Sequence, residues 1–345
     1  MKLLILLALC SCSLTVAFLP FTGSSLARHA TTGRPQRPQE AMQMTQRPQE
    51  SSASGDELSR RGLLQSTTAA LLSAVAASSL QLDPALAAGK PIAVLGANGS
   101  TGILCVAGLI ARGKPVRAIT RSGALTKDLP DKNEALLSVV EGDVSKPELL
   151  KKSLEGSGGV IFASSANFIK GTSTTVDVDN IGVINTAKAC VELGIPQLVV
   201  ISAGTVSRPK SFGYIATNLI GNIMAEKYSG ELGLKEVYAG APSSVSYTIV
   251  RPGGLDGKPK PVSALELNQG DTIGGIISRE NLADVCIEAL SNPSTKGTTF
   301  ELYETKGRAP VQGRFPKVSG FERNGNTFPE LFTGLVPDSE LKPPQ

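Results

Sequence analysis

The stretch of sequence that decides the fold is PIAVLGANGSTG, residues Pro91–Gly102. Its apolar first half is typical of a buried strand, and three glycines spaced three apart follow, at Gly96, Gly99 and Gly102. An amphipathic helix pattern then covers residues 103–112. A strand, a tight turn and a helix in this order build the pyrophosphate site of a dinucleotide-binding domain, because the N-terminus of the helix attracts anions.

The residues of this turn have separate predicted roles in holding a dinucleotide. Gly96 would let the chain turn sharply, Gly99 would let the backbone approach the phosphates, and Gly102 would let the helix lie close to the strand. The spacing is G-x-x-G-x-x-G rather than the standard G-x-G-x-x-G, and glycines also mark ordinary turns, so the triplet alone leaves an ordinary turn open. The other residues of the turn expected to contact the cofactor are Asn98, Ser100 and Thr101.

Strands and helices alternate after the turn. Strand-like runs cover residues 116–120, 137–140, 159–163, 197–202, 246–250 and 298–302, and helical periodicity covers residues 146–154, 179–193, 214–232 and 279–290. Short apolar strands alternating with helices predict an α/β fold with a doubly wound parallel sheet of Rossmann type. We expect a single NAD(P)-binding domain over residues 88–304, followed by an irregular Gly/Pro-rich C-terminal tail over residues 305–345.

The tail is rich in Gly, Pro and charge, but it also contains aromatic residues. Large apolar rings are rarely left in water, so part of the tail is expected to dock somewhere. It could wrap the domain, cover the substrate cleft or bind a protein partner, and the sequence leaves these three alternatives open. The aromatic residues are Phe315, Phe321, Phe328 and Phe332.

Residues 1–87 have the composition of a multipart targeting presequence. Residues 1–17 have the layout of a signal peptide, and residues 18–54 are rich in Arg, Ser, Thr and Pro, as transit peptides are. A twin arginine at residues 60–61 then precedes a mild apolar segment that ends in an A-x-A site at residues 85–87. A membrane anchor is the alternative for this segment, but its many Ser and Thr make it a poor span. We therefore expect no stable membrane span in the mature protein.

These three signals in series resemble the presequence of a nucleus-encoded plastid protein in an alga with a complex plastid. The resemblance implies a plastid (chloroplast) location. The third signal resembles a thylakoid-lumen signal, and the sequence leaves stroma and lumen open.

Composition excludes several classes of function. The net charge is only +4 over the whole chain, so nothing indicates a protein that binds nucleic acid or a lipid surface. The one histidine, His29, lies in the presequence, so the mature protein has no His general base, no Ser-His-Asp triad and no His-rich metal site. No metal site is expected. Cys105, Cys190 and Cys286 lie in apolar helical patterns and are expected to be buried small hydrophobes.

The end of the second predicted strand indicates which dinucleotide binds. An NAD site usually has an acidic residue there, which accepts hydrogen bonds from the ribose hydroxyls. Here Arg121 occupies that position, and no Asp or Glu follows before Asp128. A guanidinium group can pair with a 2′-phosphate through two hydrogen bonds, so NADP is predicted over NAD. The alternative is a solvated surface arginine.

Two further strand ends carry candidate cofactor contacts. Asp143 follows the third predicted strand, where it could accept a hydrogen bond from the adenine amino group. Ser164 follows the fourth, among small residues that leave room for the adenosine ribose. Either segment could be a plain loop, but ligands of such sheets bind beyond the carboxyl ends of the strands.

Together these features resemble the atypical short-chain dehydrogenase/reductase superfamily, and within it the NmrA-like NAD(P)H-binding group. The resemblance covers about residues 91–304 and implies a Rossmann fold and a nicotinamide cofactor. The stretches that carry it are Gly96–Gly102, Arg121, Gly142-Asp143, Val199–Ser202 and Tyr247–Leu255.

The chain departs from that superfamily at the catalytic motif. Catalytic members use a tyrosine as the acid, four residues before a lysine that lowers its pKa and holds the nicotinamide ribose. Lys227 is the candidate for that lysine, but Ile223 stands four residues before it, and Tyr228 projects from a different helix face. Tyr214 would reach the site only if the segment before the helix folds back.

The resemblance points to Ser202, Tyr214 and Lys227 as the catalytic candidates, with Lys227 also a cofactor contact. Ser202 matches the position of the family's catalytic serine. Structural alternatives stay open, because Tyr214 fits the apolar face of a helix and Lys227 is spaced to pair with Glu231 on a helix surface.

Two functions follow from these observations. The first is an NADP(H)-dependent oxidoreductase that acts on a small plastid metabolite with a carbonyl group or an activated double bond. The second is a non-catalytic NADP(H)-binding scaffold or redox sensor that assists assembly of photosynthetic complexes. The missing Tyr-x-x-x-Lys motif and the aromatic tail favour the second.

Overall fold

The computed structural model describes residues 89–129, 133–166, 173–219, 221–257, 264–272, 274–304, 322–325 (backbone only) and 327–341. All of these residues belong to Ala70–Gln345, the second of two units into which the chain divides. The predicted presequence, residues 1–87, lies outside the described residues, and so do Phe315 and Phe321 of the predicted tail.

A nine-stranded sheet forms the centre of the described domain, in the order β11-β8-β10-β6-β5-β4-β1-β2-β3. The strands from β3 to β10 in this order are parallel, whereas β8 and β11 are antiparallel to their neighbours. The order reverses between β1 and β4, which is the doubly wound topology of Rossmann-type folds. Their bounds are β1 (Ile92–Leu95), β2 (Val116–Thr120), β3 (Leu137–Glu141), β4 (Gly159–Phe162), β5 (Gln197–Ile201), β6 (Ser246–Pro252), β8 (Leu265–Asn268), β10 (Thr298–Glu304) and β11 (Glu322–Gly325).

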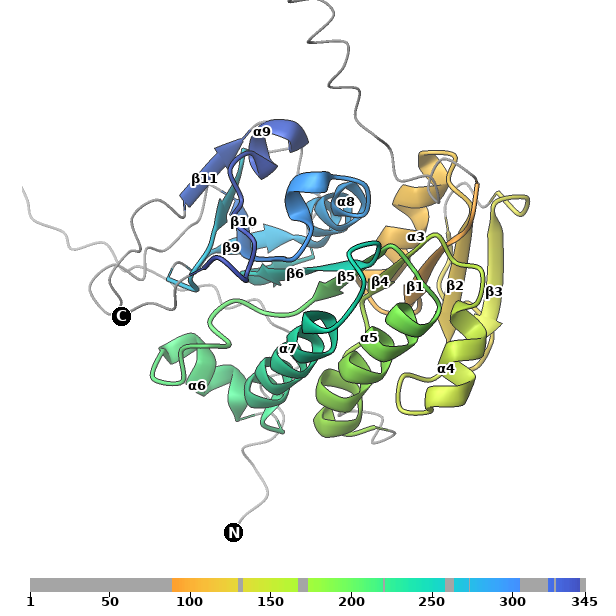
Figure 1. Cartoon of the computed structure of the whole chain (residues 1–345), viewed down its shortest axis with the longest axis horizontal. Coiled ribbons are helices and arrows are strands. Elements are labelled where there is room, and N and C mark those ends of the chain that lie inside the picture. Colours follow the sequence, from red (N-terminus) through yellow and green to blue (C-terminus); the bar gives the residue numbers. More distant parts are fainter. Residues whose placement is uncertain are drawn as a thin grey trace, which may run out of the picture. The chain divides into compact units, whose positions relative to one another are not determined.

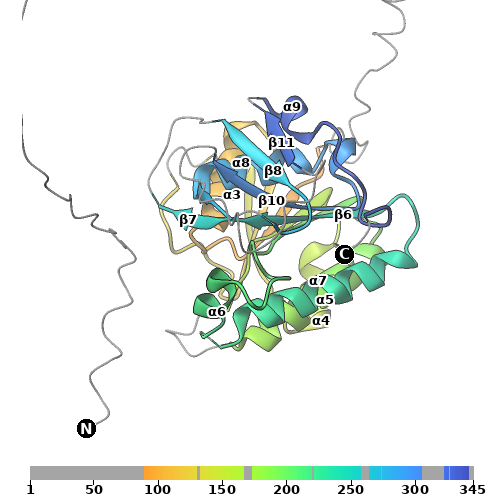
Figure 2. The same cartoon turned by 90° about the vertical axis from the view of Figure 1, so that its left-hand side faces the viewer.

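Helices cover both faces of this sheet. Figure 1 and Figure 2 show α3 and α8 on one face and α4, α5 and α7 on the other. A small second sheet pairs β7 (Gly254–Asp256) with β9 (Ile276–Ser278). The helices are α3 (Gly102–Ala111), α4 (Pro147–Leu154), a π-helix (Val176–Ile181) that runs into α5 (Gly182–Glu192), α6 (Phe212–Asn218), α7 (Ile223–Ala239), α8 (Arg279–Ala289), a 3₁₀ turn (Pro293–Thr295) and α9 (Phe328–Phe332).

Strand β1 shows why the sheet needs a layer on each face. Successive side chains of a strand point to opposite faces, so Ile92 and Val94 pack into one core while Ala93 and Leu95 pack into the other. All four are at most 1% exposed. A strand buried on both faces reads as a continuous apolar run, which is how this segment reads in the sequence.

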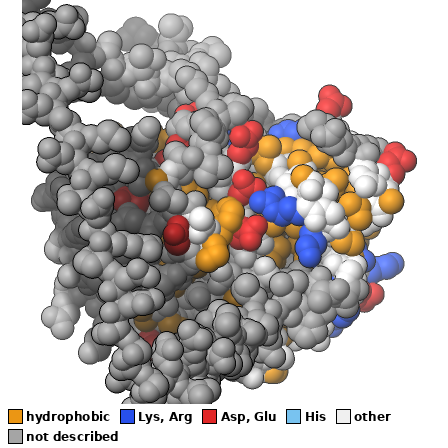
Figure 3. Space-filling model, turned by 90° about the horizontal axis from the view of Figure 1, so that it is seen from above, with side chains coloured by type: hydrophobic (Ala, Val, Ile, Leu, Met, Phe, Trp, Pro, Cys, Tyr) orange, Lys and Arg blue, Asp and Glu red, His pale blue; other side chains and the backbone are white. Residues whose placement is uncertain are grey.

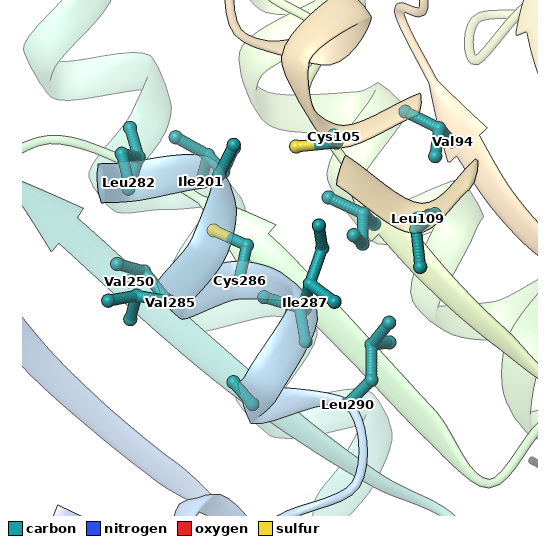
Figure 4. Close-up of a cluster of buried hydrophobic side chains, with 14 of the residues drawn as sticks. Val94, Cys105, Leu109, Ile201, Val250, Leu282, Val285, Cys286, Ile287 and Leu290 are labelled. Carbon is teal, nitrogen blue, oxygen red and sulfur yellow. The ribbon is translucent and has the colours of Figure 1, made fainter. Parts of the chain in front are cut away.

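The core between the sheet and α3/α8 contains two of the cysteines. Figure 4 shows Cys105 of α3 and Cys286 of α8 among Leu109, Val250 and Ile287. Burial raises the pKa of the Cys105 thiol to about 12, so it stays protonated and inert. Both thiols behave as the small buried hydrophobes that the sequence predicts, and so does Cys190 in the opposite core.

The surface over these helices is ordinary solvated surface. Viewed from the side of α8 and α9, hydrophobic, basic and acidic side chains are interspersed (Figure 3). Arg112, which follows α3 directly, forms ion pairs with Asp284 (2.9 Å) and Glu288 (3.4 Å) of α8. These groups are about one-third exposed, so the pairs stabilise the contact only weakly.

The α/β prediction is confirmed, and each of the six predicted strand segments contains a strand. The predicted helix over residues 214–232 is divided in two instead, because α6 ends before residues 219–222 and Asn222 adopts a left-handed φ of 57°. The π-helix, the β7–β9 pair and strands β8 and β11 had no clear pattern in the sequence.

Part of the predicted tail packs onto the domain. β11 pairs with β8, which adds a ninth strand to the sheet. Helix α9 buries Leu331 and Phe332, and the ring centroid of Phe332 lies 6.0 Å from that of Phe300 on β10. The described part of the tail therefore wraps the domain, which is one of the three alternatives that the sequence leaves open.

Asp338 fastens the segment after α9 to the amino ends of β6 and β10. Its carboxylate accepts hydrogen bonds from Thr299 N (2.9 Å), Thr299 Oγ1 (2.6 Å) and the Tyr247 hydroxyl (3.0 Å). Lys235 of α7 lies 3.0 Å from the same carboxylate, and Asp338 N donates to Gly297 O (2.7 Å). Two strands and one helix are thus joined at this edge of the sheet.

Candidate functional site

The three glycines of the turn between β1 and α3 have no space for side chains. Gly96 has a left-handed φ of 76°, and a Cβ there would lie 2.8 Å from Ser164 Oγ. A Cβ on Gly99 would lie 2.9 Å from Gly96 O, and one on Gly102 only 2.2 Å from the same atom. All three positions therefore require glycine, and the turn presents bare backbone at the N-terminus of α3, where anions are favoured.

A cavity of about 690 Å³ opens at this turn, beyond the carboxyl ends of β1 to β4. Seven of the predicted cofactor contacts line it, whereas Thr101, Gly102 and Lys227 do not. Gly102 instead packs against Gly96, and Thr101 is the N-cap residue of α3. The lining residues are Leu95, Gly96, Asn98, Gly99, Ser100, Ile119, Thr120, Arg121, Ser122, Thr126, Lys127, Gly142, Asp143, Val144, Ser145, Ala163, Ser164, Ser165, Ser173, Asp177 and Val178.

Asn98 connects the glycine turn to the loop after β2. Its Nδ2 donates to Ala124 O (2.9 Å), and its Oδ1 accepts from Thr126 N (2.8 Å). These two bonds hold Arg121 and Lys127 at one rim of the cavity, where Lys127 Nζ lies 3.5 Å from Ser100 Oγ. Sequence reasoning missed Lys127, although a second cation six residues after Arg121 was a signal available to it.

Two carboxylates at or next to the cavity have fixed partners. Asp143 lies just beyond β3, and its Oδ1 accepts from Ser145 N (3.0 Å) and Ser145 Oγ (2.7 Å). Asp179 of the π-helix is buried and accepts from Ser165 Oγ (2.8 Å) and Ala166 N (3.0 Å). Its carboxylate thereby sets the course of the segment that follows β4.

Lys227 provides the charge partner of that buried carboxylate. Lys227 Nζ lies 2.7 Å from Asp179 Oδ1, and the lysine side chain is 13% exposed. The alternative pairing with Glu231 does not occur, because Glu231 binds Arg251. Lys227 thus supports the wall of the cavity through Asp179, without lining the cavity itself. Asp179 lies in the π-helix, and π-helices often occur at functional sites.

The other two predicted catalytic residues also lie outside the cavity lining. Ser202 directly follows β5 and is 7% exposed, and its Oγ has no hydrogen-bond partner among the described residues. Tyr214 lies in α6, and its amide donates to the N-cap hydroxyl of Ser211 (3.1 Å). Within the described residues, the structure brings none of the three predicted catalytic side chains into the cavity.

A buried ionic cluster that sequence reasoning missed is centred on Arg251, near the carboxyl end of β6. Arg251 Nη2 lies 2.6 Å from Glu231 Oε2 of α7, and its Nη1 lies 3.3 Å from Glu301 Oε1 and 3.9 Å from Asp271 Oδ2. Burial would lower the pKa of Arg251, but the three carboxylates together raise it well above its ordinary value. Burial, reinforced by Asp271 and opposed by Arg251, raises the pKa of Glu301 to about 8.

A profile of the NAD(P)H-binding family matches residues 96–293. This chain belongs to the NAD(P)H-binding family. The matched range begins at the glycine turn and contains all of the cavity-lining residues except Leu95. Gly96, Gly99 and Gly102 form a glycine cradle at the N-terminus of α3, and the cavity opens beside it. This arrangement fits a bound nicotinamide dinucleotide, because the backbone at a helix N-terminus favours the pyrophosphate anion.

Individual proteins of this kind agree with the family assignment. An uncharacterized chloroplastic protein of Arabidopsis thaliana is 31% identical over 236 residues, which cover 65% of this chain and 79% of that protein. Sanguinarine reductase of Eschscholzia californica is 28% identical over 255 residues, covering 62% and 89%. A short-chain dehydrogenase/reductase of Veillonella parvula, solved in complex with NADP, has a TM-score of 0.51 at 19% identity over 64% of this chain and 97% of that one. The NAD(P)H-binding domain therefore has the fold of short-chain dehydrogenase/reductase-like oxidoreductases.

Two further findings concern the described residues as a whole. None of their helices is both long and apolar enough to cross a membrane. They also contain no group of three or more His, Cys, Asp or Glu side chains placed to hold a metal ion.

Proposed function

We propose that this protein is an NADP(H)-dependent oxidoreductase that acts on a small plastid metabolite. The observation that carries the proposal is the glycine cradle at the N-terminus of α3, which opens on a cavity with Arg121 and Lys127 at its rim. Sanguinarine reductase, one of its relatives, and the NADP complex of the Veillonella protein support the same reaction class and cofactor.

In this proposal, different residues bind different parts of the cofactor. Backbone groups of Gly96–Gly102 hold the pyrophosphate, with Ser100 as the hydroxyl donor. Asp143 accepts from the adenine amino group, and Ser164 contacts the adenosine ribose. Asn98 acts indirectly, because its side chain is already occupied by the loop after β2.

The proposed preference for NADP rests on the two cations at the rim. Arg121 and Lys127 both line the cavity, and Ser122 lies between them in the sequence. A guanidinium and an ammonium group can together bind a doubly charged 2′-phosphate, which NAD lacks. No carboxylate stands at the end of β2 to bind the free hydroxyls of NAD instead.

The substrate end is proposed to accept an apolar molecule with a carbonyl group or an activated double bond. Exposed hydrophobic side chains lie in or next to α6, which follows β5, and in the β7–β9 pair, whose first strand follows β6. Substrates of such sheets bind beyond the carboxyl ends of the strands. When bound, the nicotinamide supplies the hydride, so the protein must orient the acceptor and provide a proton. Ser202 and Tyr214 are the proposed hydroxyl groups for that step, and Lys227 supports the wall beside them. The exposed side chains are Phe212, Ile215, Leu219, Leu255 and Ile276.

A non-catalytic scaffold or sensor is the second candidate. It is supported by the ion pair that occupies Lys227 and by the absence of predicted catalytic side chains from the cavity lining. Multiple-turnover oxidation of NADPH in the presence of apolar carbonyl compounds would favour the enzyme. Tight NADPH binding without any turnover would favour the scaffold.

The plastid location is likewise proposed from the presequence pattern and from relatives whose names place them in the chloroplast. The thylakoid-lumen signal and the algal presequence depend on residues 1–87, which the structure does not describe.

The NADP preference is tested by thermal denaturation with each cofactor. We expect NADPH to raise the melting temperature more than NADH does, because only NADPH carries the 2′-phosphate. Arg121→Ala should lower the affinity for NADPH by about tenfold and leave NADH binding nearly unchanged. Lys152→Ala, at an exposed position on α4, is the matched control. Equal shifts with the two cofactors in the unmodified protein would remove the role proposed for Arg121.

A further inference from the structure

One carboxylate holds the loop that follows β5. Asp271 Oδ1 accepts from Thr205 N (2.6 Å), and its Oδ2 accepts from Ser207 N (2.9 Å) and Ser207 Oγ (2.7 Å). The Asp271 side chain has no exposed surface. A buried carboxylate that accepts three hydrogen bonds from one short loop defines the path of that loop.

The backbone conformations of Thr205 and Asp271 indicate that the hydrogen bonds between their two segments hold both segments in unusual geometry. Thr205 has a φ of 66° and Asp271 a φ of 59°, both in the left-handed region that residues other than glycine seldom adopt. Such conformations persist only where the surrounding structure enforces them, and they cluster at functional sites.

The same two segments are joined in the reverse direction by Arg208. Its Nε donates to Asp271 O (3.1 Å) and its Nη2 to Gly270 O (2.6 Å). The loop therefore donates backbone hydrogen bonds to the Asp271 carboxylate, and its Arg208 side chain donates hydrogen bonds to the carbonyl oxygens of Gly270 and Asp271.

The buried ionic cluster fixes Asp271 in turn. Asp271 N donates to Glu301 Oε2 (2.9 Å), and Arg251 Nη1 lies 3.9 Å from its carboxylate. Arg251 is held by Glu231 of α7, one turn after Lys227, which braces the cavity wall through Asp179. Helix α7 thus connects the wall of the dinucleotide cavity with the loop after β5.

This loop begins at the candidate catalytic serine and contacts the helix that carries the candidate tyrosine. Ser202 is its first residue, and a Cβ on Gly213 of α6 would lie 3.5 Å from Thr205 Oγ1. With the adenosine half of a dinucleotide beyond β2 and β3, its nicotinamide half must extend toward β5.

We propose that Asp271 is a positioning residue for the nicotinamide end of the site, which it serves by holding residues 202–208 in the one conformation that accepts the ring. The proposal rests on the proposed function. Asp271 does not touch the cofactor itself, and it acts through the loop that it binds.

The chain contains a matched control for this role. Asp338 is also a largely buried aspartate that accepts from a backbone amide and a hydroxyl and lies near a cation. It binds at the amino ends of β6 and β10, the edge of the sheet opposite to the cavity. Replacing either aspartate by asparagine turns one acceptor oxygen into a donor group, so a purely structural role predicts similar losses of stability for both.

The experiment compares Asp271→Asn and Asp338→Asn by isothermal titration calorimetry with two probes. One probe is NADPH, and the other is 2′,5′-ADP, which corresponds to the adenosine half of NADPH alone. Asparagine tolerates a left-handed φ, so the first variant adds no backbone strain. We expect Asp271→Asn to weaken NADPH binding by about tenfold and to leave 2′,5′-ADP binding unchanged. Asp338→Asn should change neither affinity.

Unchanged NADPH affinity in a folded Asp271→Asn variant overturns the proposal, and so does an equal weakening of both probes. If Asp271→Asn does not fold, Ser207→Ala removes a single hydrogen bond to Asp271 and should weaken NADPH selectively by about threefold. No such selective loss in that variant also overturns the proposal. If the unmodified protein binds neither probe, the proposed function itself fails, which is a distinct outcome.

Discussion

The two halves of the sheet's carboxyl edge keep their polar groups in place by different means. Beyond β1 to β4, glycines, serines and bare backbone surround an open cavity, and the cation Arg121 is exposed. Toward the carboxyl ends of β6 and β10, Arg251 is buried against three carboxylates, with 7% of its side chain exposed. The glycine turn of the first half is shaped by the absence of side chains, and the second half by charges that neutralise one another.

This difference has an energetic consequence. A glycine cradle needs no desolvated charge, so its stability depends on close packing alone. A buried cluster is stable only while every charge has its partners, because an unpaired ion inside a protein is very unfavourable. The three predictions below test this comparison, from the largest expected effect to the smallest.

Removing the central charge of the second half should have the largest effect. Arg251→Met would leave Glu231, Asp271 and Glu301 without their cation, and we expect a loss of about 3–5 kcal/mol in the free energy of unfolding. Arg112→Met is the control, since its ion pairs are on the surface and should contribute only about 0–1 kcal/mol. Urea denaturation of both variants measures the difference, and equal losses would show that burial of the cluster is unimportant.

Adding a single methyl group should disturb the first half. In Gly102→Ala the new Cβ would lie 2.2 Å from Gly96 O, so α3 must move away from the turn. We expect a loss of roughly 1–3 kcal/mol in stability and weaker binding of 2′,5′-ADP. Gly240→Ala places its Cβ in open space and should be nearly neutral in both assays. Wild-type binding by Gly102→Ala would contradict the close packing of the cradle.

The smallest effect is a change in pH dependence. The pKa of Glu301 is about 8 in the folded protein against an ordinary value of 4.5, because of burial first and then Asp271, with Arg251 opposing both. Between these two values the folded state holds a proton that the unfolded state has lost, so this group lowers stability as the pH rises through the window. Other titratable groups also make the stability depend on pH, so the effect of Glu301 is measured as a difference between two proteins.

Glu301→Gln removes the ionisable group while keeping its shape. The melting temperature of the variant relative to the unmodified protein should therefore increase from pH 5 to about pH 8 and level off above it. Thermal scans at a series of pH values measure this difference. A constant difference across the range would show that Glu301 keeps the same charge throughout.

How much of the site the sequence predicts also differs between the halves. The glycine turn and Arg121 are local signals, because a short stretch contains the strand, the turn and the start of the helix. Seven predicted residues accordingly line one cavity, although whether they bind a cofactor stays a prediction.

The cavity wall after β4 and the second half depend on pairs that are distant in the sequence. Lys227 pairs with Asp179, and Arg251 pairs with Glu231, Asp271 and Glu301. Each of these residues reads as an ordinary charged side chain in isolation, and no helix or strand period connects it to its partner. The interpretation of Lys227 as a surface residue paired with Glu231 was wrong for this reason.

The segment around Asp338 has a consequence for the order of folding. β6 and β10 are adjacent parallel strands at the centre of the sheet, yet their amino ends obtain Asp338 as a partner only after more than thirty further residues have been made. A ribosome releases the chain from its N-terminus onward, so the dinucleotide half can assemble during synthesis. The other half must wait, with Thr299 and Phe300 still uncovered, until residues 327–338 have emerged.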